Sequence, residues 1–349
     1  MTTLLIAGIV ILLISIVFQI AKTSEMVTVL KGADQARQDT NNVIGMIFLG
    51  FMVLFFIGIT WSVIHFMPHF LPESASVHGV WIDNIFNMTL VVTGIVFVLT
   101  QITLFIFVYK YRENKNRKAF FYPENHKLEL IWTIIPAIFM AGLVVTGLFY
   151  WLKITKDAPA DAMVIEVTGK QFNWIARYPG KDGKLGKRDF TAITDNNILG
   201  MDLNDKANSD DIIPTELHFV VGKATKIIVR SRDVMHNFDL PHFRVKIDAV
   251  PGIPTTFWFT PKYTTEEMRK ITNNPKFNYE LACAQICGQS HYAMKMAVKV
   301  ETQADFDKWI SEQKPYVETI APAAPTAAPV AAEPAAEEKK PEVKKTAAL

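Results

Sequence analysis

The chain has 349 residues, of which 50% are hydrophobic, a formal net charge of +2 and only two cysteines. This hydrophobic content is too high for an ordinary soluble protein and indicates membrane segments, while the length allows two domains. The near-zero net charge argues against a general affinity for nucleic acid. Two cysteines are too few for a disulfide scaffold, and the sequence contains no C-x-x-C-H motif for covalent attachment of haem.

Four apolar runs, at about 4–21, 44–66, 86–109 and 131–152, are each close to the ~20 residues that a membrane-spanning helix needs. The first run could also be a cleaved signal peptide. However, no basic residue precedes it, and Lys22 follows it, which is not the signal-peptide pattern. We therefore expect four membrane crossings.

The basic residues between these runs predict the orientation of the helices. Residues 22–43 and 110–127, taken as loops, contain several Lys and Arg, whereas 67–85 contains none. Cytoplasmic loops carry the excess of Lys and Arg, so 22–43 and 110–127 should be cytoplasmic. This predicts a multi-pass protein of a bacterial-type inner membrane with its C-terminal domain on the periplasmic side.

From residue 161 the pattern changes to short β-branched segments bounded by Gly or Pro, which predict strands. They lie at 163–168, 217–221, 225–230, 256–260, 277–282 and 294–301. No long helical pattern intervenes before about 303–313, so we expect an antiparallel β-sandwich or barrel. The predicted division is 1–75 and 76–155 for the helices, 156–318 for the β domain and 319–349 for a disordered Ala/Pro/Glu/Lys tail.

Two cysteines, a histidine and a methionine fall within twelve residues near the end of the β domain: Cys283, Cys287, His291 and Met294. His236 supplies a second imidazole. Two cysteines four residues apart could instead form a disulfide or, with the histidines, a zinc site. The thioether favours copper, a soft-ligand metal. A single blue-copper site uses one Cys, and the extra thiolate suits two coppers bridged by two sulfurs.

The motif C-x-x-x-C-G-x-x-H-x-x-M, preceded by D-V-x-H-x-F-x-x-P-x-x-x-x-K-x-D-x-x-P-G from Asp233 to Gly252, resembles subunit II of the haem–copper cytochrome c oxidases. The resemblance covers about 75–315. It implies a cupredoxin-like sandwich anchored by two helices, so the first two apolar runs are an extension whose aromatic residues face lipid or neighbouring helices. It also implies a dinuclear CuA centre. Its ligands would be the thiolates of Cys283 and Cys287, His236, His291, Met294 and the backbone carbonyl of Gln285.

The same resemblance points to further residues. Glu129, in a segment similar to E-x-I-W-T-x-x-P, would lie at the mouth of a proton path in subunit I, or would be an ordinary interfacial carboxylate. Phe172 stands where the family has the tryptophan through which electrons enter, and Trp174 matches the second tryptophan of the same stretch, although packing under the copper loop is the alternative for both. The family has Glu where this chain has Gln285, which puts a magnesium or manganese ion at the interface with subunit I in doubt.

The implied function is electron transfer within an oxidoreductase complex. One electron would pass from a c-type cytochrome or similar donor to copper, and then to haem in subunit I, where haem and CuB reduce oxygen to water. Other oxidase subunits and membrane lipid are the further expected partners, and nucleic acid is not one. The alternatives are a membrane-tethered copper chaperone or thiol oxidoreductase, or a related quinol oxidase subunit, which lacks the cysteines retained here.

An acidic stretch offers two interpretations. Between 195 and 216, six acids stand against the single base Lys206: Asp195, Asp202, Asp205, Asp210, Asp211 and Glu216. They could form a solvated polar loop, or a docking surface for a basic redox partner, whose association complementary charge would accelerate.

Overall fold

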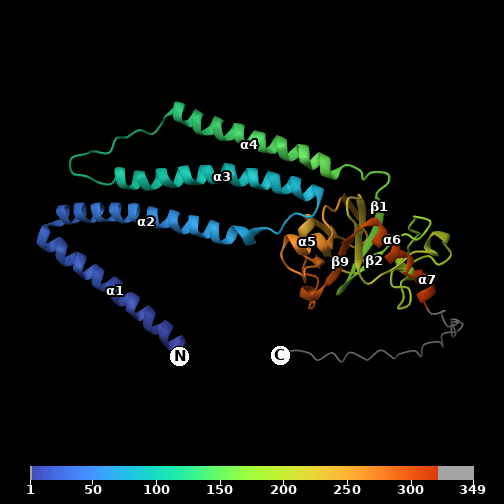
Figure 1. The fold of residues 1–349 in the computed structure, drawn as a ribbon. Helices are drawn as coiled ribbons and strands as arrows, with labels where there is room; N and C mark the ends of the chain where they lie inside the picture. The colour runs from blue at the N-terminus through green and yellow to red at the C-terminus, as the bar shows by residue number, and fades with distance from the viewer. Residues whose placement is uncertain (1, 321–349) are drawn as a thin grey trace, which may run out of the picture. The chain divides into compact units, whose positions relative to one another are not determined.

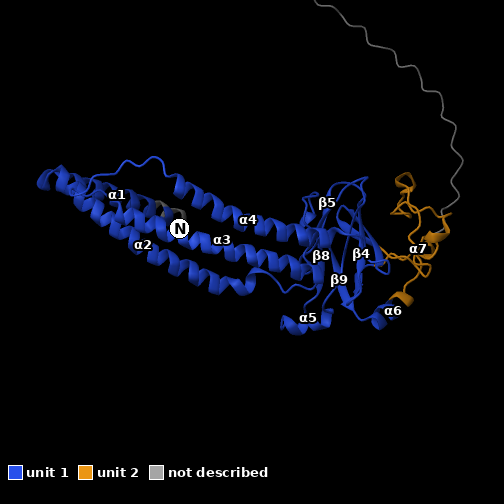
Figure 2. Ribbon diagram, turned by 90° about the horizontal axis from the view of Figure 1, so that it is seen from above, with its two compact units in different colours: residues 1–176, 215–309 blue, residues 177–214, 310–349 orange. Residues whose placement is uncertain are grey.

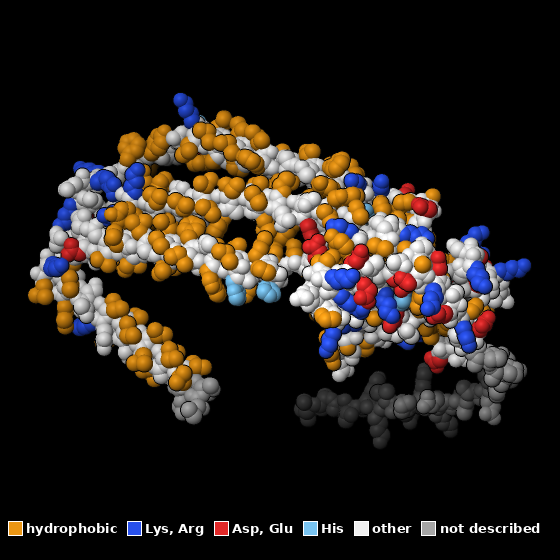
Figure 3. All heavy atoms as spheres, viewed as in Figure 1, with side chains coloured by type: hydrophobic (Ala, Val, Ile, Leu, Met, Phe, Trp, Pro, Cys, Tyr) orange, Lys and Arg blue, Asp and Glu red, His pale blue; other side chains and the backbone are white. Residues whose placement is uncertain are grey.

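The computed structural model describes residues 2–320, so the predicted tail lies outside the described residues from 321 onward. Four long helices come first, followed by a domain rich in β-strands (Figure 1). The helices are α1 (Thr2–Lys31), α2 (Ala33–Phe70), α3 (Val77–Lys110) and α4 (His126–Thr155). All four are long and apolar enough to cross a membrane. In Figure 3, apolar side chains cover the helices, whereas charged side chains gather over the β-strand-rich part.

The helices extend beyond the apolar runs that predicted them. Residues 22–43 were expected to form a loop, but α1 and α2 continue through this segment and are separated only at Gly32. Gly32 has φ +84°, a conformation that glycine adopts without a steric penalty. The predicted loop is therefore wrong, because polar residues with good helix propensity can extend a helix beyond its apolar stretch.

The extension is packed on the third helix through aromatic side chains. Phe105 of α3 lies against Phe48, Phe51 and Phe55 of α2, with ring centroids 6.3, 5.8 and 6.1 Å away, and Phe55 also lies 6.1 Å from Phe97. Three of the extension's aromatic residues thus face a neighbouring helix, one of the two environments expected for them.

The β domain consists of two sheets. Their strands are β1 (Met163–Lys170), β2 (Asn173–Arg177), β3 (Leu217–Val220), β4 (Thr225–Ser231), β5 (His236–Leu240), β6 (Val245–Ala249), β7 (Thr255–Phe259), β8 (Tyr279–Cys283) and β9 (Lys295–Glu301). One sheet has the order β2-β1-β4-β7 and the other β3-β9-β8-β5-β6. The expected six strands are present. The short strands β2, β5 and β6 had not been predicted, because their sequences lack a continuous β-branched run.

The expectation of a purely antiparallel arrangement is wrong for two pairs of strands. β1 pairs with β4 in parallel, and β3 pairs with β9 in parallel. The remaining pairs with a defined register, β4–β7, β5–β6, β5–β8 and β8–β9, are antiparallel. A parallel pair needs a long crossover connection, which strand patterns alone do not reveal.

The two sheets pack face to face through aromatic side chains. Phe259 of β7 and Phe219 of β3 have ring centroids 5.2 Å apart, and Phe257 of β7 lies 5.6 Å from Phe238 of β5. In β9, alternate residues are buried, as expected for a strand with one face toward the core. This all-β sandwich is the cupredoxin-like fold that was predicted, and it carries the loops of the site as a stiff support.

Short helices complete the β domain: α5 (Thr265–Ile271) and α6 (Gln303–Ser311), with the 3₁₀ turns η3 (Pro241–Phe243) and η4 (His291–Ala293). The helix predicted at 303–313 is confirmed as α6. Helix α5 had not been predicted. It begins with a full capping box between Thr264 and Glu267, a local signal that is visible in the sequence.

A second compact unit comprises 177–214 together with the described residues from 310 onward (Figure 2). It contains the turns η1 (Phe190–Ala192) and η2 (Lys206–Asn208) and the short helix α7 (Tyr316–Thr319). The backbones of Tyr178 and Ile212 exchange two hydrogen bonds of 2.9 and 3.0 Å. The buried Arg177 donates from Nε to Asp211 Oδ2 at 2.9 Å.

The six acids between 195 and 216 do not form one surface. Asp211 is fully buried in its ion pair with Arg177. Asp205 caps η2 by accepting from the Ala207 N–H, and Asp202 accepts from the Asn204 N–H. Several of these carboxylates therefore organise the loop itself, which favours the first of the two interpretations.

Candidate metal centre

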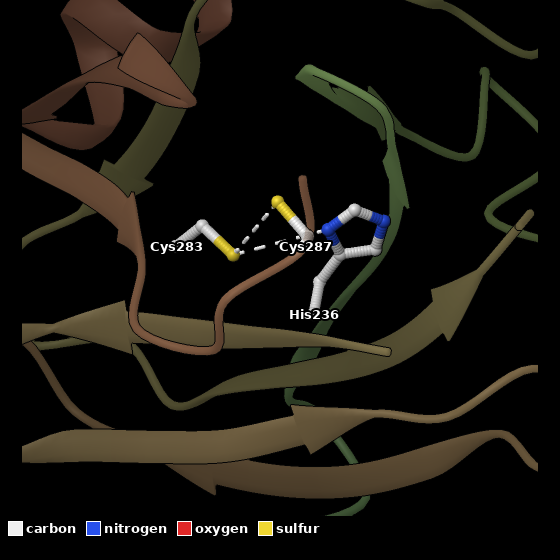
Figure 4. Close-up of side chains that lie close together, drawn as sticks. All are labelled: His236, Cys283 and Cys287. Atoms are coloured by element: carbon white, nitrogen blue, oxygen red, sulfur yellow. Dashed lines mark hydrogen bonds between the residues drawn. The ribbon is translucent and has the colours of Figure 1, made fainter. Parts of the chain in front are cut away.

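The three residues in Figure 4 come from two neighbouring strands and the loop after them. His236 is the first residue of β5, and Cys283 is the last residue of β8. Since β5 and β8 run antiparallel with Phe238 opposite Cys283, His236 is brought beside that cysteine. His236 Nδ1 lies 3.8 Å from Cys283 Sγ, and the two Sγ atoms are 3.9 Å apart. The three donor atoms, from His236, Cys283 and Cys287, all lie within 4.8 Å of one another, and the three residues are buried.

The remaining predicted ligands lie on the loop that joins β8 to β9. His291 Nδ1 is 3.7 Å from Cys287 Sγ, and Met294 Sδ is 3.8 Å from the same sulfur. The backbone carbonyl of Gln285 lies 3.2 Å from Cys283 Sγ. The other four predicted ligands are thus gathered around the two cysteine sulfurs, with one imidazole beside each sulfur.

The loop is held by backbone contacts at both ends. Cys283 N–H donates to the Met294 carbonyl at 3.1 Å, and Ala284 N–H donates to the Asn237 carbonyl at 3.1 Å. Gly288 has φ +139°, and a Cβ there would come within 2.9 Å of the Phe172 ring. Glycine is therefore required at this position both by backbone conformation and by space.

Asp233 and Gln171 support the site, although neither had been predicted as a site residue. Asp233 Oδ1 lies 2.8 Å from His236 Nε2 and accepts from the Val234 N–H, while Oδ2 accepts from the Gln171 N–H at 2.8 Å. Burial by itself would raise the pKa of Asp233, but the hydrogen bonds from Gln171 and His236 outweigh it and lower the pKa. Because the Asp233 carboxylate contacts Nε2 of the His236 ring, the other ring nitrogen, Nδ1, faces the cysteine sulfurs. The D-V-x-H motif was the available sequence signal for Asp233.

The chemistry of the donors fits copper. The two cysteines are free, and their separation is far longer than the ~2.05 Å of a disulfide. Burial raises the pKa of the Cys287 thiol to about 11, and the neighbouring Cys283 adds to the effect. A metal that binds these thiols as thiolates must therefore displace protons. Two thiolates, two imidazoles and a thioether are the soft and intermediate ligands that copper prefers, whereas a zinc site would leave the thioether unused.

The two predicted aromatic residues lie beside this centre. Trp174 is only 3% exposed, and its ring centroid is 6.0 Å from that of His236 and 5.8 Å from that of Phe238. Phe172 is half-buried, and its ring lies against Gly288. The burial of Trp174 favours its packing role.

Glu129 belongs to a different region, the first turn of α4. Its carboxylate accepts from the Asn125 N–H at 3.2 Å and lies 3.3 Å from His126 Nδ1. These contacts are those of a residue that caps the helix N-terminus, where a negative charge is favourable.

Comparison with known proteins identifies the family to which the chain belongs. The family "Cytochrome C oxidase subunit II, transmembrane domain" matches residues 61–149, and "Cytochrome C oxidase subunit II, periplasmic domain" matches 163–301. The alternative cytochrome c oxidase subunit 2 of Bradyrhizobium diazoefficiens is 34% identical over 268 residues, which cover 76% of this chain and 92% of that protein. Cytochrome c oxidase subunit 2 of Thermostichus vulcanus is 27% identical, with 68% and 77% covered.

Among solved structures, the periplasmic domain of subunit II of cytochrome oxidase from Bradyrhizobium japonicum is 26% identical, with a TM-score of 0.32. It covers 47% of this chain and matches over 100% of its own length. The family matches begin at residue 61, so α1 and the first part of α2 precede them. The similarity to the Bradyrhizobium diazoefficiens relative over nearly its whole length, together with the two family matches, shows that this chain is a member of the cytochrome c oxidase subunit II family, the membrane-bound subunits of an oxidoreductase complex with an extracytoplasmic β domain.

Proposed function

We propose that this chain receives electrons for a respiratory haem–copper oxidase on a dinuclear copper centre. The observation that carries the proposal is the symmetry of the donors: two free sulfurs 3.9 Å apart, with His236 beside one and His291 beside the other. Cys283 and Cys287 would bridge both ions, Met294 would be a weak ligand, and the Gln285 carbonyl would complete the set.

Copper would supply reversible exchange of a single electron. The residues of the chain hold the donors in one arrangement and keep water away from them. Cys283, Cys287, His236 and Met294 are buried, and both ends of the ligand loop are fixed to the sheet by backbone hydrogen bonds. Such rigidity favours electron transfer, because a site whose geometry changes little between the oxidised and reduced states has a small reorganisation energy.

We infer that electrons come from a c-type cytochrome or a similar carrier and leave for haem in subunit I, where haem and CuB would reduce oxygen to water. Phe172, at the half-buried edge of the centre, and Trp174, beneath His236, are the proposed path into it. Glu129 is proposed to lie at the mouth of a proton path in subunit I. Because Asp211 is buried, a docking surface for a basic donor would have to use the more accessible acids, such as Asp195.

The proposed location is a bacterial inner membrane, with both ends of the chain and the copper domain on the periplasmic side. The basic residues around 110–118 support this orientation. A reporter fused after Arg117 should be cytoplasmic, and one fused at Ser76 should be periplasmic. The reverse pattern would contradict the orientation.

The decisive experiment is purification of the complex from membranes, followed by measurement of copper and haem and by electron paramagnetic resonance. We expect two coppers per chain, co-purified haem, and a hyperfine pattern from one electron shared by two equivalent nuclei. Cys283→Ser should abolish that signal, because a hydroxyl cannot replace a bridging thiolate. Ser290→Ala, in the same loop, is the matched control and should retain it.

A single-copper signal would refute the dinuclear centre. Copper without co-purified haem or subunit I would favour the alternative, a membrane-tethered copper chaperone or thiol oxidoreductase.

A further inference from the structure

Gln171, in the turn between β1 and β2, contacts both segments that carry the metal ligands. Its backbone N–H donates to Asp233 Oδ2 at 2.8 Å, and the other oxygen of Asp233 lies 2.8 Å from His236 Nε2. Its side-chain Nε2 donates to the backbone carbonyl of Cys287 at 2.5 Å. A single residue therefore links the support of one imidazole to the backbone of one bridging cysteine.

The ligand loop approaches this turn closely because position 288 is glycine. A Cβ on Gly288 would lie 2.9 Å from Gln171 Nε2 and 2.9 Å from the Phe172 ring. The contact between the Gln171 amide and the Cys287 carbonyl is thus part of a closely packed junction, which has no room for a side chain at position 288.

The backbone hydrogen bonds that close the loop or join it to β5 lie at its ends: Cys283 N–H donates to the Met294 carbonyl, and Ala284 N–H donates to the Asn237 carbonyl. Within the loop, His291 N–H donates to the Gly288 carbonyl at 3.2 Å. Cys287 lies between these ends. Its sulfur is the donor atom shared by the contacts to Cys283, His291 and Met294. Any backbone movement at Cys287 would change three contacts of the centre together.

We propose that Gln171 is a positioning residue of the copper centre. Its side-chain amide fixes the backbone of Cys287 and so keeps the two sulfurs equivalent with respect to the two imidazoles. The inference rests on the proposed function, because equivalence of the sulfurs matters for a centre that shares one electron between two metals.

The side chain must donate a hydrogen bond and must have the length of Gln. Glu has nearly the same shape, but an ionised carboxylate can only accept, so it cannot bond to a carbonyl. Ala removes the contact without adding a charge. The backbone N–H of residue 171 persists in every variant, so the Asp233–His236 contact is retained and any effect reports on the side chain.

The test uses the full-length chain in its purified complex, with Gln171→Ala, Gln171→Glu and the control Gln289→Ala. Gln289 is an exposed glutamine of the same ligand loop. Copper content should remain at the wild-type level in all three. In both Gln171 variants the hyperfine pattern should change from two equivalent nuclei toward unequal ones. Copper release to a chelator should accelerate by on the order of five-fold, the factor expected for one hydrogen bond.

Gln171→Glu should in addition lower the midpoint potential, since a nearby negative charge favours the more positive oxidised centre. Gln289→Ala should match wild type in every measurement. If Gln171→Ala yields no assembled complex, the nearly isosteric Gln171→Glu decides the test.

Wild-type spectra and wild-type copper release in the Gln171 variants would overturn the positioning role and leave the proposed function intact. A wild-type chain without the dinuclear signal would instead refute the proposed function, and this inference with it.

Discussion

Replacement of Asp233 by Asn tests how far the copper centre depends on a residue that does not contact the metal. Asp233 Oδ1 accepts from the Val234 N–H at 2.7 Å and lies 2.8 Å from His236 Nε2, and Oδ2 accepts from the Gln171 N–H at 2.8 Å. Both oxygens therefore act as acceptors. The amide of Asn has one oxygen and one NH₂ group, so it cannot reproduce all three contacts.

The less costly orientation of the amide places its oxygen at the Oδ1 position and its NH₂ group against the Gln171 N–H. One hydrogen bond to a charged group is then lost, which costs about 1.5–3 kcal/mol. The imidazole also loses a negatively charged partner that raises its basicity as a ligand. Substitution of such supporting residues typically lowers metal affinity about 10–100-fold, equivalent to about 1.4–2.7 kcal/mol. The lost hydrogen bond to Gln171 lowers the stability of the folded chain, whereas the loss of the charged partner of His236 acts on the metal, so we expect copper affinity to fall about 10–100-fold.

The measurement is a competition titration of the full-length protein, purified in detergent, against a copper chelator. Asp195→Asn is the matched control, because Asp195 is exposed and lies outside the ligand segments. Asp233→Ala should have a larger effect than Asp233→Asn, since it leaves His236 Nε2 without its acceptor. Equal copper affinities for Asp233→Asn, Asp233→Ala and wild type would refute the argument that this carboxylate orients His236.

Substitutions at two other positions test the role of the Gln285 backbone carbonyl and that of the buried Asp211 carboxylate. Gln285→Ala should leave copper content and the visible spectrum unchanged because the carbonyl persists, whereas Gln285→Glu should increase manganese binding by the assembled complex, seen by its paramagnetic signal. Equal tight manganese binding by wild type and Gln285→Glu would mean that partner residues hold this ion without position 285. Asp211→Ala should destabilise the fold by about 3–5 kcal/mol, because it leaves the buried Arg177 without its counter-ion. Thermal unfolding of the detergent-purified chain measures this loss, and a change no larger than that of Asp195→Ala would contradict the buried ion pair.

Asp233 and Gln171, which support the proposed copper ligands, differ in how far along the chain they lie from the residues that they contact. Sequence patterns can reveal only contacts between residues that are close in the chain. The D-V-x-H spacing places Asp233 three residues before His236, so its contact with the imidazole is local and could have been proposed. Gln171 lies 116 positions before Cys287, and its hydrogen bond to that residue depends on how the β1–β2 turn meets the ligand loop. No periodicity or motif spacing relates two segments so far apart.

The acidic stretch illustrates a different limit. Asp202 and Asp211 look alike as residues of one polar loop, yet Asp211 is fully buried. Its partner Arg177 ends strand β2 and lies 34 positions away. Composition indicates how many charges a segment carries, but burial and pairing depend on which distant residue the fold brings beside each charge.

The sequence by itself predicted the membrane helices and most of the strands, and its resemblance to the oxidase subunit II family implied all six proposed copper ligands. Apolar length, β-branched runs and the spacing of soft donors are properties of short segments, and each is tied to one physical requirement. The tertiary structure alone decided the parallel pairing of β1 with β4, the placement of one imidazole beside each sulfur and the contact of Gln171 with Cys287. These features arise when segments far apart in the chain pack together, and the free energy of that packing is not encoded in any one of them.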